Sequence, residues 1–208
     1  MAIQSAIEEK GNWITHGIGV LIFIIGFFIL LDSNSNITKY STAAIIIYCL
    51  ALIMLYTAST VYHYVTVEHL KQKLRILDHI SIYFLIAGTY TPVTLIPLID
   101  SKGWLLFTLV WSITALGTVL KLFFTGRFEV ISLILYVVMG WLIVLDMEVL
   151  SQKVGEDGIN YLIYGGIAYT GGIVFYTMRK LKFQHVIWHC FVLAGSIFHF
   201  IFIWKYII

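Results

Sequence analysis

The sequence predicts an all-α integral membrane protein with seven transmembrane helices, which form a single domain of residues 1–208. Of the 208 residues, 60% are hydrophobic and only 12% are charged, which is about half the charged share of an ordinary soluble domain. The apolar residues come in long runs separated by short polar stretches. The runs are continuous rather than alternating, which disfavours the strands of a membrane β-barrel.

Seven windows of the chain reach or nearly reach the length of about 20 mostly apolar residues that a helix needs to cross a bilayer. The predicted spans are residues 13–31, 41–64, 76–98, 103–120, 128–145, 159–178 and 186–207. The stretches between them are short and polar, and no repeat with a period of 20–50 residues is visible. One compact unit of seven spans is therefore expected.

Several windows have features of their own. The first lacks a basic leader and a cleavage site of small residues, so it predicts a retained span rather than a signal peptide. In the third, Pro92 and Pro97 indicate a kink or the end of a helix. The fifth is the weakest, because only 16 residues separate Glu129 from Asp146. Either Arg127 or Asp146 is therefore expected at the level of the lipid headgroups.

The orientation follows from the positive charges. On a seven-span topology, one side of the membrane holds nine Lys and Arg residues and the other side holds four. Because cytoplasmic segments carry the excess of positive charge, the N-terminus is expected in the cytoplasm and the C-terminus outside. Six ionisable residues then share the cytoplasmic ends of the spans: His16, His63, Asp78, His79, His185 and His189.

The convergence of these residues at one membrane depth indicates a metal site. His185 and His189 are four residues apart, so their rings lie about 40° apart around a helix and about 6 Å apart along it. Zinc favours neutral imidazole ligands, and a catalytic zinc takes three protein ligands and a water. His63 is the expected third ligand. Asp78 is expected to bind the metal or hold its water, and Ser59, one turn before His63, to hydrogen-bond a ligand, the water or a substrate carbonyl.

Simpler interpretations of the same residues stay open. Two histidines at a span end can be interfacial residues that bind no metal. The same applies to three further histidines: His16, His69 and His79. Asp78 could pair with Arg75 or Lys73 at the interface, and His199, deep in the last span, could bond across helices or line a cavity.

The remaining composition excludes one class of partner. The net charge is only +2, without a basic or aromatic patch, so no nucleic-acid partner is expected and membrane lipids are the expected partners. Cys49 and Cys190 both lie inside apolar runs. They are expected as small buried thiols, with one disulfide between two spans as the alternative.

Five short motifs, in this order and at these places on the seven spans, make the chain resemble a known family. They are EEKGNWITHG (Glu8 to Gly17), STVYH (Ser59 to His63), LDHISIYFLIAGTYTP (Leu77 to Pro92), HVIWH (His185 to His189) and LAGSIFHF (Leu193 to Phe200). The chain looks like a bacterial hemolysin III protein of the progestin and adipoQ receptor family, which belongs to a wider group of seven-span proteins with alkaline ceramidases. The resemblance covers essentially the whole chain.

The resemblance implies a zinc ion held by His63, His185 and His189, with Asp78 contacting the zinc-bound water and Ser59 nearby. It also implies a cytoplasmic N-terminus, in agreement with the charge count. Glu9 and His16 are shared features without an assigned role.

The function expected from these residues is that of a zinc-dependent hydrolase of the bacterial plasma membrane, acting on a lipid or acyl amide or ester. Likeness to ceramidases favours an amide. Two alternatives belong to other classes: a cytolytic, pore-forming protein, as the name hemolysin III implies, and a receptor or regulator of membrane state in which zinc is structural.

Overall fold

A computed structural model of the chain describes residues 5–178 and 180–208. Every regular element in these residues is a helix, which confirms the all-α prediction. The helices are α1 (Ala6–Asp32), α2 (Ser41–Tyr64), α3 (Glu68–Leu95), α4 (Gly103–Phe124), α5 (Glu129–Trp141), the short 3₁₀ helix η1 (Leu142–Asp146), α6 (Met147–Thr177) and α7 (Gln184–Tyr206).

Two helices begin well before the apolar windows predicted for them. α1 starts at Ala6 because Ser5 and Glu8 form a capping box. The Ser5 hydroxyl accepts from the Glu8 backbone N–H at 3.3 Å, and the Glu8 carboxylate accepts from the Ser5 backbone N–H at 2.8 Å. α3 starts at Glu68, so the stretch EHLKQKLR, which was expected to be a connection, forms its first turns. These added turns carry polar side chains that reach the site described below.

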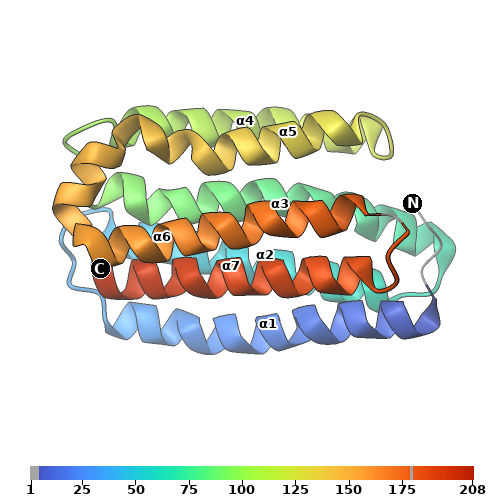
Figure 1. Cartoon of the computed structure of the whole chain (residues 1–208). Helices are drawn as coiled ribbons and strands as arrows, with labels where there is room; N and C mark the ends of the chain where they lie inside the picture. The colour runs from blue at the N-terminus through green and yellow to red at the C-terminus, as the bar shows by residue number, and fades with distance from the viewer. Residues whose placement is uncertain (1–4, 179) are drawn as a thin grey trace.

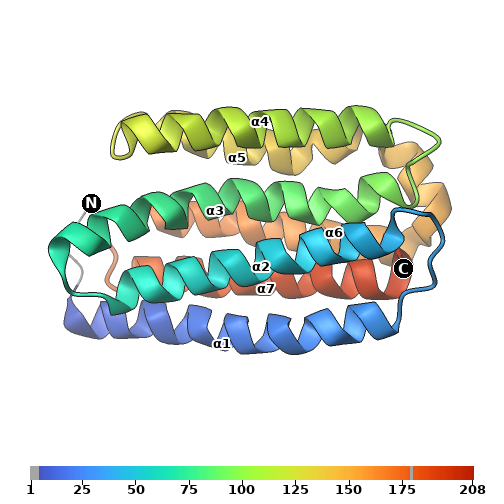
Figure 2. The ribbon, with the colours of Figure 1, turned by 180° about the vertical axis from the view of Figure 1, so that it is seen from behind.

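The helices lie side by side along one common direction, and successive helices run in opposite directions (Figure 1 and, from behind, Figure 2). α1 packs against α2 and α7, α2 against α3, α3 against α4, and α6 against α7. α4 and α5 form an outer layer, and α1 lies on the opposite side of the bundle (Figure 1). α1, α3 and α7 begin, and α2 ends, at the same end of the bundle, on the right in Figure 1.

In the described residues, five helical stretches are long and apolar enough to cross a membrane, as expected for an all-α membrane protein. They are α1, α2, α4, α7 and the continuous stretch Glu129–Thr177, which comprises α5, η1 and α6. α3 is less apolar because its first turns are charged and the rest of it carries polar residues such as His79, Ser81 and Thr91, all of them buried. Since α3 packs between α2 and α4, these side chains face protein rather than lipid.

The outer surface of the bundle is apolar. Large hydrophobic side chains are exposed on α1, α4 and α5, among them Leu21, Phe28, Leu116, Phe123 and Val130. The fully buried side chains include three tyrosines, Tyr48, Tyr56 and Tyr83. Apolar groups outside and hydroxyl-bearing rings inside are the arrangement expected when lipid, and not water, covers the surface.

The stretch from α5 to α6 changes direction. Gly155, inside α6, has φ 70° and ψ 179°, a conformation that glycine adopts readily and other residues rarely do. The chain turns near this point, and α6 runs back along the bundle (Figure 1). Residues 151–158, expected as a polar loop, are therefore helical on both sides of one break.

Asp146 fixes the start of α6, the helix that contains this turn. Its carboxylate accepts hydrogen bonds from the Ser101 hydroxyl at 2.9 Å and from the Lys102 backbone N–H at 3.0 Å. Only 4% of Asp146 is exposed, whereas Arg127, the other residue expected at headgroup level, is exposed. α3 ends at Leu95, three residues after Pro92, as a proline in the last turn favours.

The two cysteines are free thiols, so the disulfide alternative is wrong. Cys49 is buried in α2, as expected. Cys190 is exposed, because it lies about 100° around α7 from the buried His189 and so faces outward.

Candidate metal centre

Three histidines from two helices come together where α2 ends and α7 begins. His63 lies in the last turn of α2, and His185 and His189 lie in the first two turns of α7. One ring nitrogen of each lies within 4.8 Å of those of the other two. His63 and His189 are buried and His185 is half-buried. Within the described ranges, this is the one group of His, Cys, Asp or Glu side chains placed closely enough to hold a metal ion.

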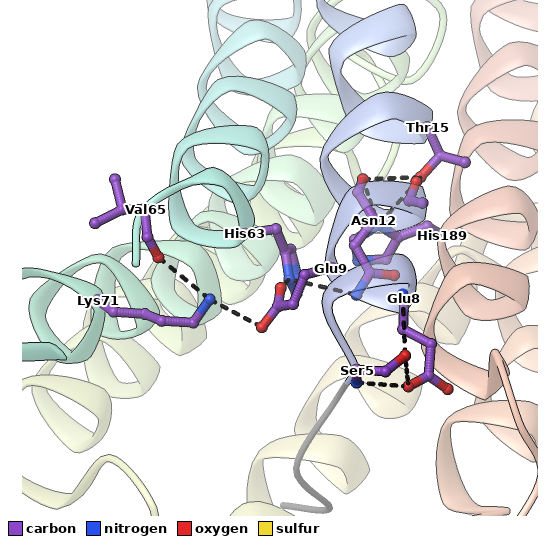
Figure 3. Close-up of polar contacts among 10 residues, drawn as sticks. Ser5, Glu8, Glu9, Asn12, Thr15, His63, Val65, Lys71 and His189 are labelled. Atoms are coloured by element: carbon purple, nitrogen blue, oxygen red, sulfur yellow. Dashed lines mark hydrogen bonds and ion pairs between the residues drawn. The ribbon is translucent and has the colours of Figure 1, made fainter. Parts of the chain in front are cut away.

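Glu9, on α1, determines which nitrogen of His63 is available. His63 Nδ1 lies 2.6 Å from Glu9 Oε2, and an ionised carboxylate can only accept, so Nδ1 carries the proton and donates it. Nε2 is then an unprotonated acceptor. It is buried and has no hydrogen-bond partner among residues 5–178 and 180–208. A buried imidazole nitrogen of this kind fits a metal ligand. Figure 3 shows Glu9 between His63 and Lys71.

The backbone of α1 acts on His189 in the same way. His189 Nδ1 lies 3.2 Å from the backbone oxygen of Asn12 and 3.4 Å from the Thr15 hydroxyl (Figure 3). A carbonyl oxygen accepts only, so Nδ1 donates to Asn12 and leaves Nε2 for another partner. Outer hydrogen bonds that orient ligand imidazoles accompany most histidine metal sites. The donor set and its surroundings therefore fit a metal that prefers imidazole nitrogen.

Lys71 completes the contacts of Glu9. Its Nζ lies 2.9 Å from Glu9 Oε1, and it also donates to the backbone oxygen of Val65 at 3.3 Å. Lys71 lies in the first turns of α3, outside the span predicted for that region. The Glu9 carboxylate thus joins the starts of α1 and α3 to the end of α2.

Asp78 and Ser59 lie close to the three histidines and to each other. Both line a cavity of about 150 Å³ together with His185 and His189. The Ser59 hydroxyl interacts with the Asp78 carboxyl, and Ser59 is buried with 1% exposed. The rest of the lining comes mainly from apolar side chains of α2, α3, α5, α6 and α7. The structure thus brings Ser59, Asp78, His185 and His189 to one mostly apolar cavity, with His63 beside the two histidines of α7.

A second polar cluster lies between α3, α4 and α5 and involves none of the predicted ligands. Glu129 accepts from Lys121 at 2.8 Å and from Arg75 at 3.4 Å, and His79 Nδ1 lies 3.9 Å from the same carboxylate. Lys121 is only 1% exposed. Arg75 therefore pairs with Glu129, and the described residues form no ion pair between Asp78 and either Arg75 or Lys73 within 4.0 Å.

The other histidines divide between surface and interior. His69 is exposed, as an interfacial residue would be. His16 and His79 are buried inside the bundle rather than on its surface. His199 both bonds across helices and lines the cavity, the two roles that the sequence left open. Its Nε2 lies 3.2 Å from the backbone oxygen of Leu162 in α6, and its side chain is part of the cavity wall.

Sequence reasoning left Glu9 and His16 without a role and did not single out Asn12 or Thr15. Glu9, Asn12 and His16 are spaced i, i+3 and i+7, which puts them on one face of α1. A polar face at the start of an otherwise apolar helix was the signal available. Its partners lie about 50 to 177 residues away in the chain, so only the fold identifies them.

The chain as a whole is similar to known proteins. Residues 4–200 match the family described as Haemolysin-III related. A Hemolysin-3 homolog from Bacillus subtilis (strain 168) is 42% identical over 191 residues, which cover 91% of this chain and 89% of that protein. Hemolysin-3 from Bacillus cereus is 38% identical over 202 residues, covering 97% and 92%.

The similarity extends to animals. The human Monocyte to macrophage differentiation factor is 31% identical over 213 residues, covering 96% of this chain and 84% of that protein. Together with the apolar helices, these matches place the chain in the bacterial cell membrane as a multi-pass protein.

Proposed function

This chain belongs to the haemolysin-III-related family, and we propose that it is a zinc-dependent hydrolase of a lipid or acyl amide or ester. The observation that carries the proposal is the cluster of His63, His185 and His189, two of which line a mostly apolar cavity. Three imidazole donors favour zinc over hard cations such as Mg²⁺ or Ca²⁺, which prefer oxygen ligands.

Bound at this cluster, zinc would polarise a substrate carbonyl and lower the pKa of a bound water to about 7. The side chains of the chain would do the remaining work. Asp78 would accept the proton of the attacking water. Ser59, next to Asp78 in the cavity wall, would hydrogen-bond the substrate carbonyl. Glu9 and the Asn12 backbone would hold two of the ligand rings in orientation.

The shape and lining of the cavity indicate the substrate class. His185, His189 and Asp78 line it, and much of the remaining wall is apolar, including Leu55 and Val192. An amphiphile with a carbonyl at the polar end and an acyl chain along the apolar wall would match this division. We propose membrane lipids as the source of the substrate, because exposed apolar side chains surround the bundle.

We also propose that the chain crosses the membrane seven times, with its N-terminus in the cytoplasm. The alternating directions of α1 to α7 support this topology (Figure 1). The nine-to-four distribution of Lys and Arg supports the orientation. Because α1 and α7 begin and α2 ends at one end of the bundle, the candidate metal centre would lie near the cytoplasmic face.

Two substitutions test the hydrolase. We expect His185→Ala to lower bound zinc, measured by elemental analysis of the purified protein, and to abolish turnover of a panel of lipid amides and esters. We expect Asp78→Asn to keep zinc and to lower turnover about 10²- to 10⁴-fold, as the loss of a general base does. His69→Ala, at an exposed histidine, is the matched control. Stoichiometric zinc in His185→Ala would refute the ligand assignment.

A second candidate function follows from the name of a relative, Hemolysin-3 of Bacillus cereus, namely lysis of membranes. The measurement that separates the two is dye leakage from liposomes containing the purified protein. Leakage without turnover of any lipid would favour the pore. Turnover that Asp78→Asn abolishes, without leakage, would favour the enzyme. Bound zinc with neither activity would favour a regulator of membrane state in which the metal is structural.

A further inference from the structure

His16 is a buried polar side chain that the proposed reaction does not use. It lies on α1 and is only 3% exposed. Neither of its ring nitrogens has a hydrogen-bond partner within residues 5–178 and 180–208. Buried polar groups in folded proteins are nearly always hydrogen-bonded. At least one nitrogen of this imidazole is therefore left for a ligand that binds beside it.

The position of His16 indicates where that ligand lies. Its ring stacks on the ring of His189, with centroids 3.6 Å apart and an angle of 12° between the planes. The His16 ring also makes an edge contact with the ring of Tyr56, with centroids 4.9 Å apart. His16 also lines the cavity that Ser59 and Asp78 line. The ring is thus fixed in place beside the candidate metal centre and reaches the space that a substrate would occupy.

We propose that His16 is a substrate-binding residue, which accepts a hydrogen bond from an N–H or O–H group in the head of an amphiphile bound in the cavity. This inference rests on the proposed function and defines its substrate class more narrowly. One ring nitrogen of His16 lies toward the backbone carbonyl of His189 without reaching hydrogen-bond geometry. A carbonyl favours the proton on the nitrogen nearest to it, so the other nitrogen is an acceptor.

The preference for a donor distinguishes the role of His16 from the roles proposed for the other residues. Zinc would attract the carbonyl oxygen of a substrate, and Ser59 would donate to that oxygen. Asp78 also accepts hydrogen bonds, but in the proposed reaction it takes the proton of the attacking water, which leaves His16 to accept from a headgroup N–H or O–H. An acceptor at His16 would select secondary amides and hydroxylated headgroups over simple esters and tertiary amides that have the same acyl chain.

The test compares two fluorescent probes on zinc-loaded protein in detergent. One is a stearoyl ethanolamide labelled on its chain, and the other is its N-methyl, O-methyl counterpart, which keeps the carbonyl but has no donor. We expect the wild-type protein to bind the first about 5- to 10-fold more tightly, the effect of one hydrogen bond. In His16→Phe, which keeps an aromatic ring for the stack, we expect equal affinities and unchanged zinc content. His69→Phe is the matched control at an exposed histidine.

Three results would overturn the proposal: equal affinities in the wild-type protein, an unchanged preference in His16→Phe, or loss of zinc in His16→Phe. The last would show that His16 acts only by supporting His189. If His16→Phe does not elute as a single folded species, His16→Leu provides the same comparison. Recovery of intact probe is checked by chromatography. If the wild-type protein hydrolyses none of the panel of lipid amides and esters while His16→Phe still loses the preference, the hydrolase is refuted and the binding role of His16 stands.

Discussion

Glu9 shows how a partly exposed residue at the start of a helix can support a buried site. Its side chain is 24% exposed, yet one carboxylate oxygen lies 2.6 Å from His63 Nδ1 and the other lies 2.9 Å from Lys71 Nζ. The carboxylate fixes the protonation of the His63 ring and directs its second nitrogen away from Glu9. Glu9 would therefore act on the metal centre through its ligand His63 and not by contact with the substrate.

We expect Glu9→Gln to weaken zinc binding about 10- to 100-fold, because residues that orient ligand imidazoles typically contribute this much to metal affinity. The amide is neutral, and its N–H₂ group can donate to Nδ1 and so favour the wrong tautomer. The dissociation constant is measured by competition with a chromophoric chelator.

Glu68→Gln is the control for this change, because Glu68 is exposed at the start of α3 and contacts only neighbouring groups of the same helix. Its zinc affinity should equal that of the wild-type protein. An unchanged dissociation constant in Glu9→Gln would show that the contact seen here does not act on the metal site.

At the scale of the helices, close approach between α3 and α4 depends on one glycine. A Cβ at Gly117 of α4 would lie 2.3 Å from the ring of Tyr83, which is a fully buried side chain of α3. The ring is enclosed by the core and packs on Tyr136 with centroids 4.5 Å apart. It therefore cannot move aside without displacing other side chains.

We expect Gly117→Ala to lower the free energy of unfolding by about 1–3 kcal/mol, the usual cost of overpacking a close-packed core. Unfolding is followed by circular dichroism during titration of the purified protein with a denaturing detergent.

Gly140→Ala is the matched control, because a Cβ at Gly140 of α5 meets no atom within 4 Å. That variant should be about as stable as the wild-type protein, since alanine also favours the helix. Equal stability of the two variants would mean that the α3–α4 contact is looser than described here.

At the scale of the whole molecule, Lys73 and Lys153 should face opposite sides of the membrane. Lys73 lies in the first turns of α3, at the end of the bundle that holds the histidines, and Lys153 lies near the break at Gly155. In the proposed orientation, which rests on the excess of positive charge, the first of these ends lies in the cytoplasm.

We expect a membrane-impermeant maleimide to label Lys153→Cys in intact cells and Lys73→Cys only after permeabilisation. Both substitutions are made in a Cys190→Ser background, because Cys190 is the exposed native thiol and Cys49 is buried. Labelling of Lys73→Cys in intact cells would reverse the orientation. Labelling of both would contradict a single topology.

The helices were predictable because each apolar run is longer than a globular core needs, and the predicted windows of α1, α2, α4 and α7 overlap the observed helices. The polar turns at the starts of α1 and α3 were not predictable from hydrophobicity. They form because a capping box at Ser5 and pairing with neighbouring helices stabilise polar residues as helix. The helical stretch 151–158 was also missed, because its residues are polar. It belongs to α6, and Asp146 fixes the start of that helix through contacts with Ser101 and Lys102.

By itself, the sequence determined the helical class and the membrane location, because long apolar runs are a local pattern. It also allowed five candidate site residues to be proposed, because the histidine spacing and the short motifs around them are local too. Tertiary structure alone decided which side chains orient the histidines, that Lys121 and Glu129 pair inside the bundle, and that His16 lies unpartnered beside His189. The physical reason is that each of these contacts joins different helices. Hydrogen bonds and ion pairs between helices depend on how the helices pack, and no local pattern of residue types records that packing.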